Sequence, residues 1–201
     1  MKKRLLLVAV PLALTIGTPA AAKPADQPAP ISEGTFRTWS EATPAVTYDT
    51  AVVPQGATAK LTVQNTGSAM RVRLQATGLV PGRTYGAHVH VNPCTDKPAE
   101  AGPHYQHRID PAADPQHPSV DPDYANPRNE VWLDFTANSA GNGYAASVLR
   151  WQFSESRPAW SLVLHSERTH TKPGEAGMAG ARVACLTRTA LPAYENAPGR
   201  G

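Results

Sequence analysis

Long apolar runs are nearly missing from this chain of 201 residues. One run occupies residues 5–16, and no later stretch reaches the roughly 18 apolar residues that a membrane-spanning helix needs. Three basic residues precede the run, and the small-residue pattern Ala20-Ala-Ala22 follows it. We therefore expect residues 1–22 to be a secretory signal peptide cleaved near Ala22, and the mature chain to have no transmembrane segment.

A surplus of charge of one sign is also lacking. The full chain has 19 Lys and Arg residues against 16 Asp and Glu residues, and the expected leader holds three of the basic residues and none of the acidic ones. The mature chain is therefore formally neutral. This balance gives no reason to expect nucleic acid or a membrane surface as a partner.

Cysteine is scarce, because Cys94 and Cys185 are the only two in the chain. An even number of cysteines in an exported chain is typical of a disulfide bond. Two free thiols, or two soft copper ligands, are the alternative interpretation. No cysteine follows the expected leader closely, so a lipid anchor is not expected.

Helical periodicity is absent, and no stretch of ten or more residues repeats its apolar positions as a helix does. Short segments of strand character, separated by glycine and proline turns, are present instead at residues 57–64, 70–75, 87–91, 131–137, 144–153, 160–165 and 181–187. They predict an all-β fold, a Greek-key β-barrel or sandwich of about eight antiparallel strands.

The remaining segments set the expected domain boundaries. Residues 95–129 and 166–180 lack a strand pattern and are predicted to be two long functional loops. Residues 23–44 are rich in proline and alanine and are predicted to be a flexible spacer. The β-barrel domain is then expected at residues 45–188, with a disordered tail at 189–201.

Histidines carry the strongest functional signal. His88 and His90 lie two residues apart in a segment of strand character, so their side chains are expected on the same face. His104 and His165 stand in equally distinctive settings. Four imidazole nitrogens without a thiolate or a carboxylate suit a tetragonal copper(II) site.

Several blocks of the sequence resemble the copper/zinc superoxide dismutase family in its secreted bacterial form. They are Gly78-Leu-Val-Pro-Gly82, His88-Val-His90 with Cys94, Ala101-Gly-Pro-His104, Leu162-Val-Leu-His165 and Ala179-Gly-Ala-Arg-Val-Ala-Cys185. The resemblance as a whole extends over roughly residues 57–186. The resemblance implies a secreted, copper-dependent enzyme that converts superoxide to oxygen and hydrogen peroxide.

The same resemblance assigns roles to individual residues. It makes His88, His90, His104 and His165 the copper ligands and joins Cys94 to Cys185 in a disulfide. His104 and Arg182 are then catalytic: His104 detaches from reduced copper and carries a proton to the peroxide, and Arg182 holds the anion beside the metal. A guanidinium suits that task because it stays charged and presents a planar fork of donors.

The zinc half of the family's site is not reproduced. Val131 and Arg128 stand where the family has a zinc-binding aspartate and histidine, and no counterpart is seen of the acidic residue that links the two metals. The sequence therefore predicts an enzyme that works with copper alone. Candidate ligands for a relocated zinc site are His107 and His117, with Asp110, Asp114 or Asp121.

Two other interpretations stay open. The altered zinc region and the short loop at 166–180 also fit a secreted copper-binding or copper-buffering protein with little turnover. Cupin-type oxygenases carry a similar pair of histidines, but they place a glutamate where this chain has Cys94.

Overall fold

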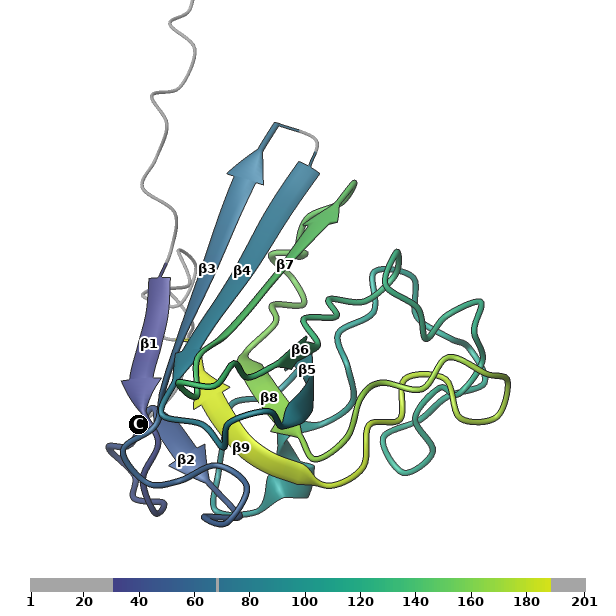
Figure 1. The fold of residues 1–201 in the computed structure, drawn as a ribbon. Coiled ribbons are helices and arrows are strands. Elements are labelled where there is room, and N and C mark those ends of the chain that lie inside the picture. The colour runs from purple at the N-terminus through teal and green to yellow at the C-terminus, as the bar shows by residue number, and fades with distance from the viewer. Residues whose placement is uncertain (1–30, 68, 189–201) are drawn as a thin grey trace, which may run out of the picture.

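The computed structural model describes residues 31–67 and 69–188, which form two antiparallel β-sheets (Figure 1). The first sheet has the order β1-β3-β4-β7, with β1 (Ile31–Thr35), β3 (Thr58–Thr66), β4 (Ala69–Thr77) and β7 (Gly143–Leu149). The second has the order β2-β9-β8-β5-β6, with β2 (Ala45–Thr47), β9 (Arg182–Thr187), β8 (Ser161–His165), β5 (Thr84–His90) and β6 (Phe135–Thr136). The predicted all-β, Greek-key fold is confirmed.

Helix is confined, within the described ranges, to one 3-10 turn, η1 (Pro98–Ala101). None of the described segments contains a helix with the length and apolar character to cross a membrane.

Alternating side chains build the first sheet as the sequence predicts. Met70, Val72 and Leu74 of β4 are buried, whereas Arg71 between them is exposed. Leu74 lies opposite Leu61 of β3, so apolar rows from neighbouring strands meet on the face turned toward the second sheet.

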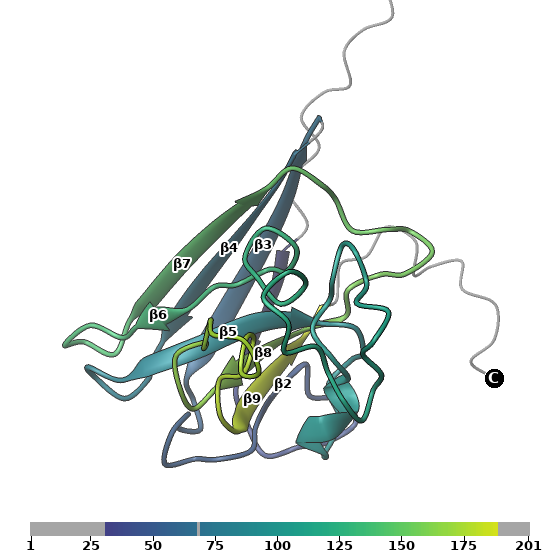
Figure 2. The same cartoon turned by 90° about the vertical axis from the view of Figure 1, so that its right-hand side faces the viewer.

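Strand β5 is buried on both of its faces, and this positions the functional site. Tyr85, Ala87 and Val89 point into the main core between the sheets. His88 and His90 therefore point to the outer side of the second sheet, where they are nevertheless fully buried. The two long loops provide that cover, because they lie over β5 and β8 (Figure 2).

The folded domain begins earlier than the sequence predicted. Strand β1 pairs along its whole length with β3, so residues 31–44 are part of the domain, and the predicted boundary at residue 45 is wrong. Gly34 permits this start, because a Cβ there would lie 2.7 Å from the Cβ of Ala45. The proline-rich composition of this region gave no indication of β1, which is short and pairs with a strand that is distant in sequence. The expected leader, the spacer before residue 31 and the tail at 189–201 lie outside the described residues.

The strand predicted at residues 131–137 is shorter than expected. Only Phe135 and Thr136 form β6, and the segment before them makes isolated bridges through Glu130 and Trp132. Trp132 bridges to His88, so this segment leaves the ladder to run beside the histidines.

Candidate metal centre

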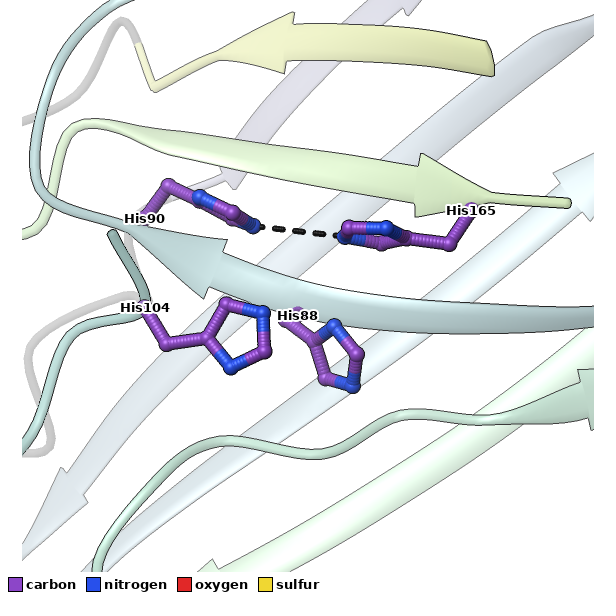
Figure 3. Close-up of side chains that lie close together, drawn as sticks. All are labelled: His88, His90, His104 and His165. Carbon is purple, nitrogen blue, oxygen red and sulfur yellow. Dashed lines mark hydrogen bonds between the residues drawn. The ribbon is translucent and has the colours of Figure 1, made fainter. Parts of the chain in front are cut away.

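Four histidines from three parts of the fold converge on one place (Figure 3). His88 and His90 come from β5, and His165 ends the neighbouring strand β8. His104 follows η1 and reaches the group through a β-bridge with His90. The ring centroids of His88 and His104 lie 4.0 Å apart, and the Nε2 atoms of His90 and His165 are separated by 3.4 Å.

One nitrogen from each of these imidazoles lies within 4.8 Å of the others, which is close enough for all four to bind one metal ion. No other group of three or more potential ligands with such spacing occurs in residues 31–67 and 69–188. His88, His90 and His165 are buried, whereas the side chain of His104 keeps 15% of its surface exposed.

A hydroxyl and a carboxylate orient His88. Its Nε2 lies 2.7 Å from the Oγ1 of Thr169, and that hydroxyl donates to Oδ1 of Asp134 at 2.7 Å. The single hydroxyl proton goes to the carboxylate, so Nε2 of His88 must be the donor to Thr169. The lone pair is thereby left on Nδ1, which is buried without a hydrogen-bond partner and faces the group. A metal ion would satisfy this atom.

Glu130 orients His104 in the same way. The Nδ1 of His104 donates to Oε2 of Glu130 at 2.7 Å, because a carboxylate only accepts. Glu130 is 2% exposed and also accepts from Gln106 and from the indole of Trp132. This buried carboxylate therefore leaves Nε2 of His104 as the nitrogen with the lone pair.

His90 takes its orientation from the backbone. Its Nδ1 donates to the carbonyl oxygen of Gly102 at 2.9 Å, so its Nε2 also carries a lone pair. Outer partners of this kind fix the tautomer and ring orientation of metal-binding histidines. The folded chain therefore sets the ligand geometry of these rings by itself.

Gly86 permits the close approach of the loop that carries Thr169. The backbone N–H of Gly86 donates to the carbonyl of Glu167 at 2.6 Å. A Cβ at this position would lie 2.6 Å from that same oxygen and 2.7 Å from the Cβ of Ala179. Any larger residue at position 86 would push the loop, and Thr169 with it, away from His88.

Burial keeps three of the imidazoles neutral. Desolvation lowers the pKa of His88 and of His90 well below the ordinary histidine value, and the nearby imidazoles and Arg182 act in the same direction. Burial, followed by the charges of His104 and Arg182, lowers the pKa of His165 to about 3, against a smaller opposite effect of the Gly180 backbone. Metals bind the neutral form of imidazole, so these rings are ready to act as ligands at neutral pH.

The metal-free protein should lose stability as the pH falls below about 6.5, the ordinary pKa of histidine. Between this pH and the lowered pKa values, the unfolded chain binds protons at His88, His90 and His165 and the folded chain does not. Stability from this source is thus present above about pH 6.5 and declines toward acid. For His165 alone the loss at pH 4.5 is about 3 kcal/mol.

Urea unfolding of the metal-free protein across this pH range measures the effect, and the His165→Gln variant should show a shallower pH dependence. NMR titration of the His165 ring gives a second readout that does not depend on how the variant folds. A ring that becomes protonated near pH 6.5 in the folded protein would contradict the expectation.

Arg182 lies beside the histidines. It begins β9 directly opposite His165, and it lines a cleft that also contains His104 and His165. Its Nη1 donates to the carbonyl oxygens of Pro98 and Ala99 at 3.0 and 3.2 Å. Burial lowers the pKa of Arg182, with Tyr48 acting in the opposite direction. The 3-10 turn η1 therefore holds the guanidinium at the edge of the site.

Cys94 and Cys185 form a disulfide with their Cα atoms 5.7 Å apart, and the described residues contain no free cysteine. The bridge lies in a small second core with Val46, Ala101 and Val163. It attaches the segment that leads into η1 to strand β9. The bridge therefore links the turn that accepts hydrogen bonds from Arg182 to the strand that carries Arg182.

Comparison with known proteins agrees with this geometry. The sequence profile of a family described as copper/zinc superoxide dismutase matches residues 56–187, well over half of the chain. The chain belongs to the copper/zinc superoxide dismutase family.

Among solved structures, the chain is similar to a Cu/Zn superoxide dismutase from Brucella abortus, with 22% identity and a TM-score of 0.45 over 65% of this chain and 87% of that one. It is also similar to a double mutant of a superoxide dismutase-like protein from Bacillus subtilis, with 15% identity and a TM-score of 0.44 over 64% of this chain and 87% of the other. No curated protein matches the chain.

His107 and His117, the histidines considered for a relocated zinc site, each contact other groups. His107 stacks on the indole of Trp151 with ring centroids 5.0 Å apart. His117 is exposed, and its ring Nδ1 lies 3.1 Å from the carboxylate of Asp114. Neither belongs to a group of three potential ligands in the described part of the chain, so the structure does not support that hypothesis.

Sequence reasoning missed the residues that orient the ligands. Glu130, Trp132 and Asp134 contact the histidines or their partner Thr169, whereas Val131 and Leu133 between them are buried in the core. This alternation is visible in the sequence, and it could have placed two acidic residues and an aromatic one on the histidine side. Asp134 is an acidic residue that contacts His88 through Thr169, and the sequence analysis did not identify it.

Proposed function

We propose that this protein is a secreted superoxide dismutase that works with copper alone, converting two superoxide anions and two protons into oxygen and hydrogen peroxide. The observation that carries the proposal is the convergence of four imidazoles, with an orphaned buried nitrogen on His88, beside the cation Arg182. Family membership supports the same activity.

His88, His90, His104 and His165 would hold the copper, since imidazole nitrogens suit this metal in both of its oxidation states. When bound, copper supplies the one-electron chemistry that takes an electron from one superoxide and gives it to the next. Arg182 attracts the anion and holds it at the mouth of the site through charge and hydrogen bonds.

Proton delivery is assigned to His104. It is the most exposed of the four rings, so its Nε2 can exchange a proton with solvent when that atom is not bound to metal. The Glu130 carboxylate at Nδ1 stabilises the positively charged imidazolium that results. One proton can then pass from Nε2 to the peroxide, and a second proton from solvent completes neutral hydrogen peroxide, which leaves the site.

Glu130 also supports activity without zinc. The bridging histidine of the family binds one metal through each ring nitrogen, and here the Nδ1–H of His104 is engaged by the buried carboxylate. Glu130 thus takes over the orienting role that a second metal would have.

Export is part of the proposal. The leader expected at residues 1–22 would carry the chain out of the cytoplasm. The Cys94–Cys185 bridge supports this location, because disulfides persist in oxidising compartments.

The test is to load the protein with one equivalent of copper, measure its metal content, and follow superoxide consumption. We expect one copper, no zinc, and a rate far above that of free copper blocked by a chelator. A rate no faster than this blank would refute the enzyme, and one bound zinc per chain would refute the copper-only form.

A copper-buffering role is the second candidate, since Arg182 already donates to two carbonyl oxygens and the ligands are deeply buried. The Arg182→Ala variant separates the two functions. For an enzyme we expect turnover to fall about tenfold, because the attraction of the anion is lost, while copper affinity changes little. The Arg182→Lys variant retains the charge, so its turnover should lie between that of the native protein and that of Arg182→Ala. If the protein is a copper buffer, the native protein consumes superoxide no faster than chelator-blocked copper, and neither variant changes that rate.

A further inference from the structure

A cleft of about 800 Å³ opens above the metal centre. His104, His165 and Arg182 line it, and its walls come from the loops around residues 103–120 and 177–182. The N–H of Gly174 donates to the carbonyl of Val120 at 3.1 Å and so joins the two loops, which lie side by side in Figure 1. A water molecule fills about 30 Å³ in the liquid, so a diatomic anion needs only a small part of this space. The volume falls within the range of about 300–1,000 Å³ that is typical of pockets for organic ligands.

Large apolar side chains gather at this cleft. Among the described residues six large apolar side chains are exposed, and three of them, Ile109, Val120 and Met178, line it. The exposed fractions of Ile109 and Met178 are 56% and 53%. Trp160 adds a flat apolar surface. Clustered exposed apolar groups mark binding surfaces, whereas scattered ones need no explanation. Superoxide, a small hydrated anion, gains nothing from such walls.

The charged groups of the cleft favour an anion. Arg157 and Arg182 line it, and each guanidinium donates to backbone carbonyl oxygens. Within residues 31–67 and 69–188, neither forms an ion pair with a carboxylate. The two carboxylates in the lining, those of Asp114 and Glu130, each contact a histidine. The cleft therefore combines two cations that lack a carboxylate partner with apolar walls.

We propose that this cleft binds small organic anions with a flat apolar body, of the class of aromatic carboxylates. The carboxylate contacts Arg182 or Arg157, and the ring packs against Ile109, Met178 and Trp160. The inference goes beyond dismutation, because such binding needs neither copper nor turnover.

Calorimetric titration of the whole protein, metal-free and copper-loaded, with three probes tests the proposal. 2-Naphthoate carries both features, acetate has the charge without the rings, and 2-naphthalenemethanol has the rings without the charge. We expect 2-naphthoate to bind at least about tenfold more tightly than either of the others, in both metal states. Equal affinity for acetate would reduce the cleft to a simple anion site, and equal affinity for the alcohol would remove the role of the arginines. Either outcome overturns the proposal.

Exposed residues provide matched variants. Met178→Asp places a negative charge in the wall and should weaken 2-naphthoate binding about tenfold or more. Val148→Asp is the control, because Val148 is 64% exposed on β7 and does not line the cleft. Arg157→Gln should weaken binding of 2-naphthoate but not of the alcohol. An equal loss in the Val148 and Met178 variants would overturn the assignment to this cleft.

The 2-naphthoate test can fail or succeed independently of the test for superoxide dismutation. Active copper-loaded protein that does not bind 2-naphthoate would disprove only the organic-anion site. Metal-free protein that binds 2-naphthoate, with no dismutation after copper loading, would disprove only the enzyme.

Discussion

Replacing Glu130 with glutamine should weaken copper binding by about 10–100-fold, the usual cost of losing an outer partner of a metal-binding histidine. The amide is neutral, so it polarises the Nδ1–H of His104 less strongly than the carboxylate does at 2.7 Å. It can also place its NH2 group toward Trp132 or Gln106, which both donate to Glu130 in the native protein. His104 would then lose its fixed tautomer, and Nε2 would no longer be the only nitrogen with a lone pair.

Competition with a copper chelator of known affinity measures this change. Glu33→Gln is the matched control, because Glu33 lies on β1 and its carboxylate pairs with the half-buried Lys60. The control should bind copper as the native protein does. A Glu130→Gln variant with unchanged affinity would show that the carboxylate is not what orients His104.

Replacing both cysteines with serine should cost about 4–5 kcal/mol of folding free energy on the chain-entropy estimate, because the bridge closes a loop with a sequence separation of 91 residues. The variant should also retain copper less well at a temperature at which it is still folded. The physical reason is that the bridge ties the segment before η1 to β9, and the carbonyls of η1 hold Arg182 opposite His165.

Thermal unfolding and copper retention after gel filtration at low temperature separate these two effects. Native protein treated with a reductant, under conditions where it stays folded, serves as a control that leaves the side chains unchanged. A variant that melts earlier but keeps its copper and full turnover would limit the bridge to a role in stability. Two free thiols in the purified native protein would refute the bridge itself.

The sequence was most informative where local pattern and tertiary environment agree. The alternation in β4 predicts its buried side because one face meets the core and the other meets solvent. The spacing of His88 and His90 predicts a shared face because strand geometry has a period of two residues. The approach of His104 and His165 follows from family resemblance, since it depends on loops and strand order that no local pattern contains.

Other features depend on contacts between distant segments and were missed for that reason. Strand β1 has little strand character of its own and forms because β3 offers an unpaired edge. Glu130 functions only because the loop bearing His104 reaches it from 26 residues away. Thr169 looks like an ordinary loop residue until the close approach at Gly86 brings it over His88.

The hydrogen bonds of Thr169, Glu130 and Gly102 to the ligand rings have a consequence for assembly. All three are made by the polypeptide itself, so the chain can complete its folding before any metal arrives. Copper would then enter a finished site, and reorganisation of the protein would contribute little to the barrier for uptake. Under the proposed copper-only function, a cell needs to supply one kind of ion, and it can do so after synthesis and folding are over.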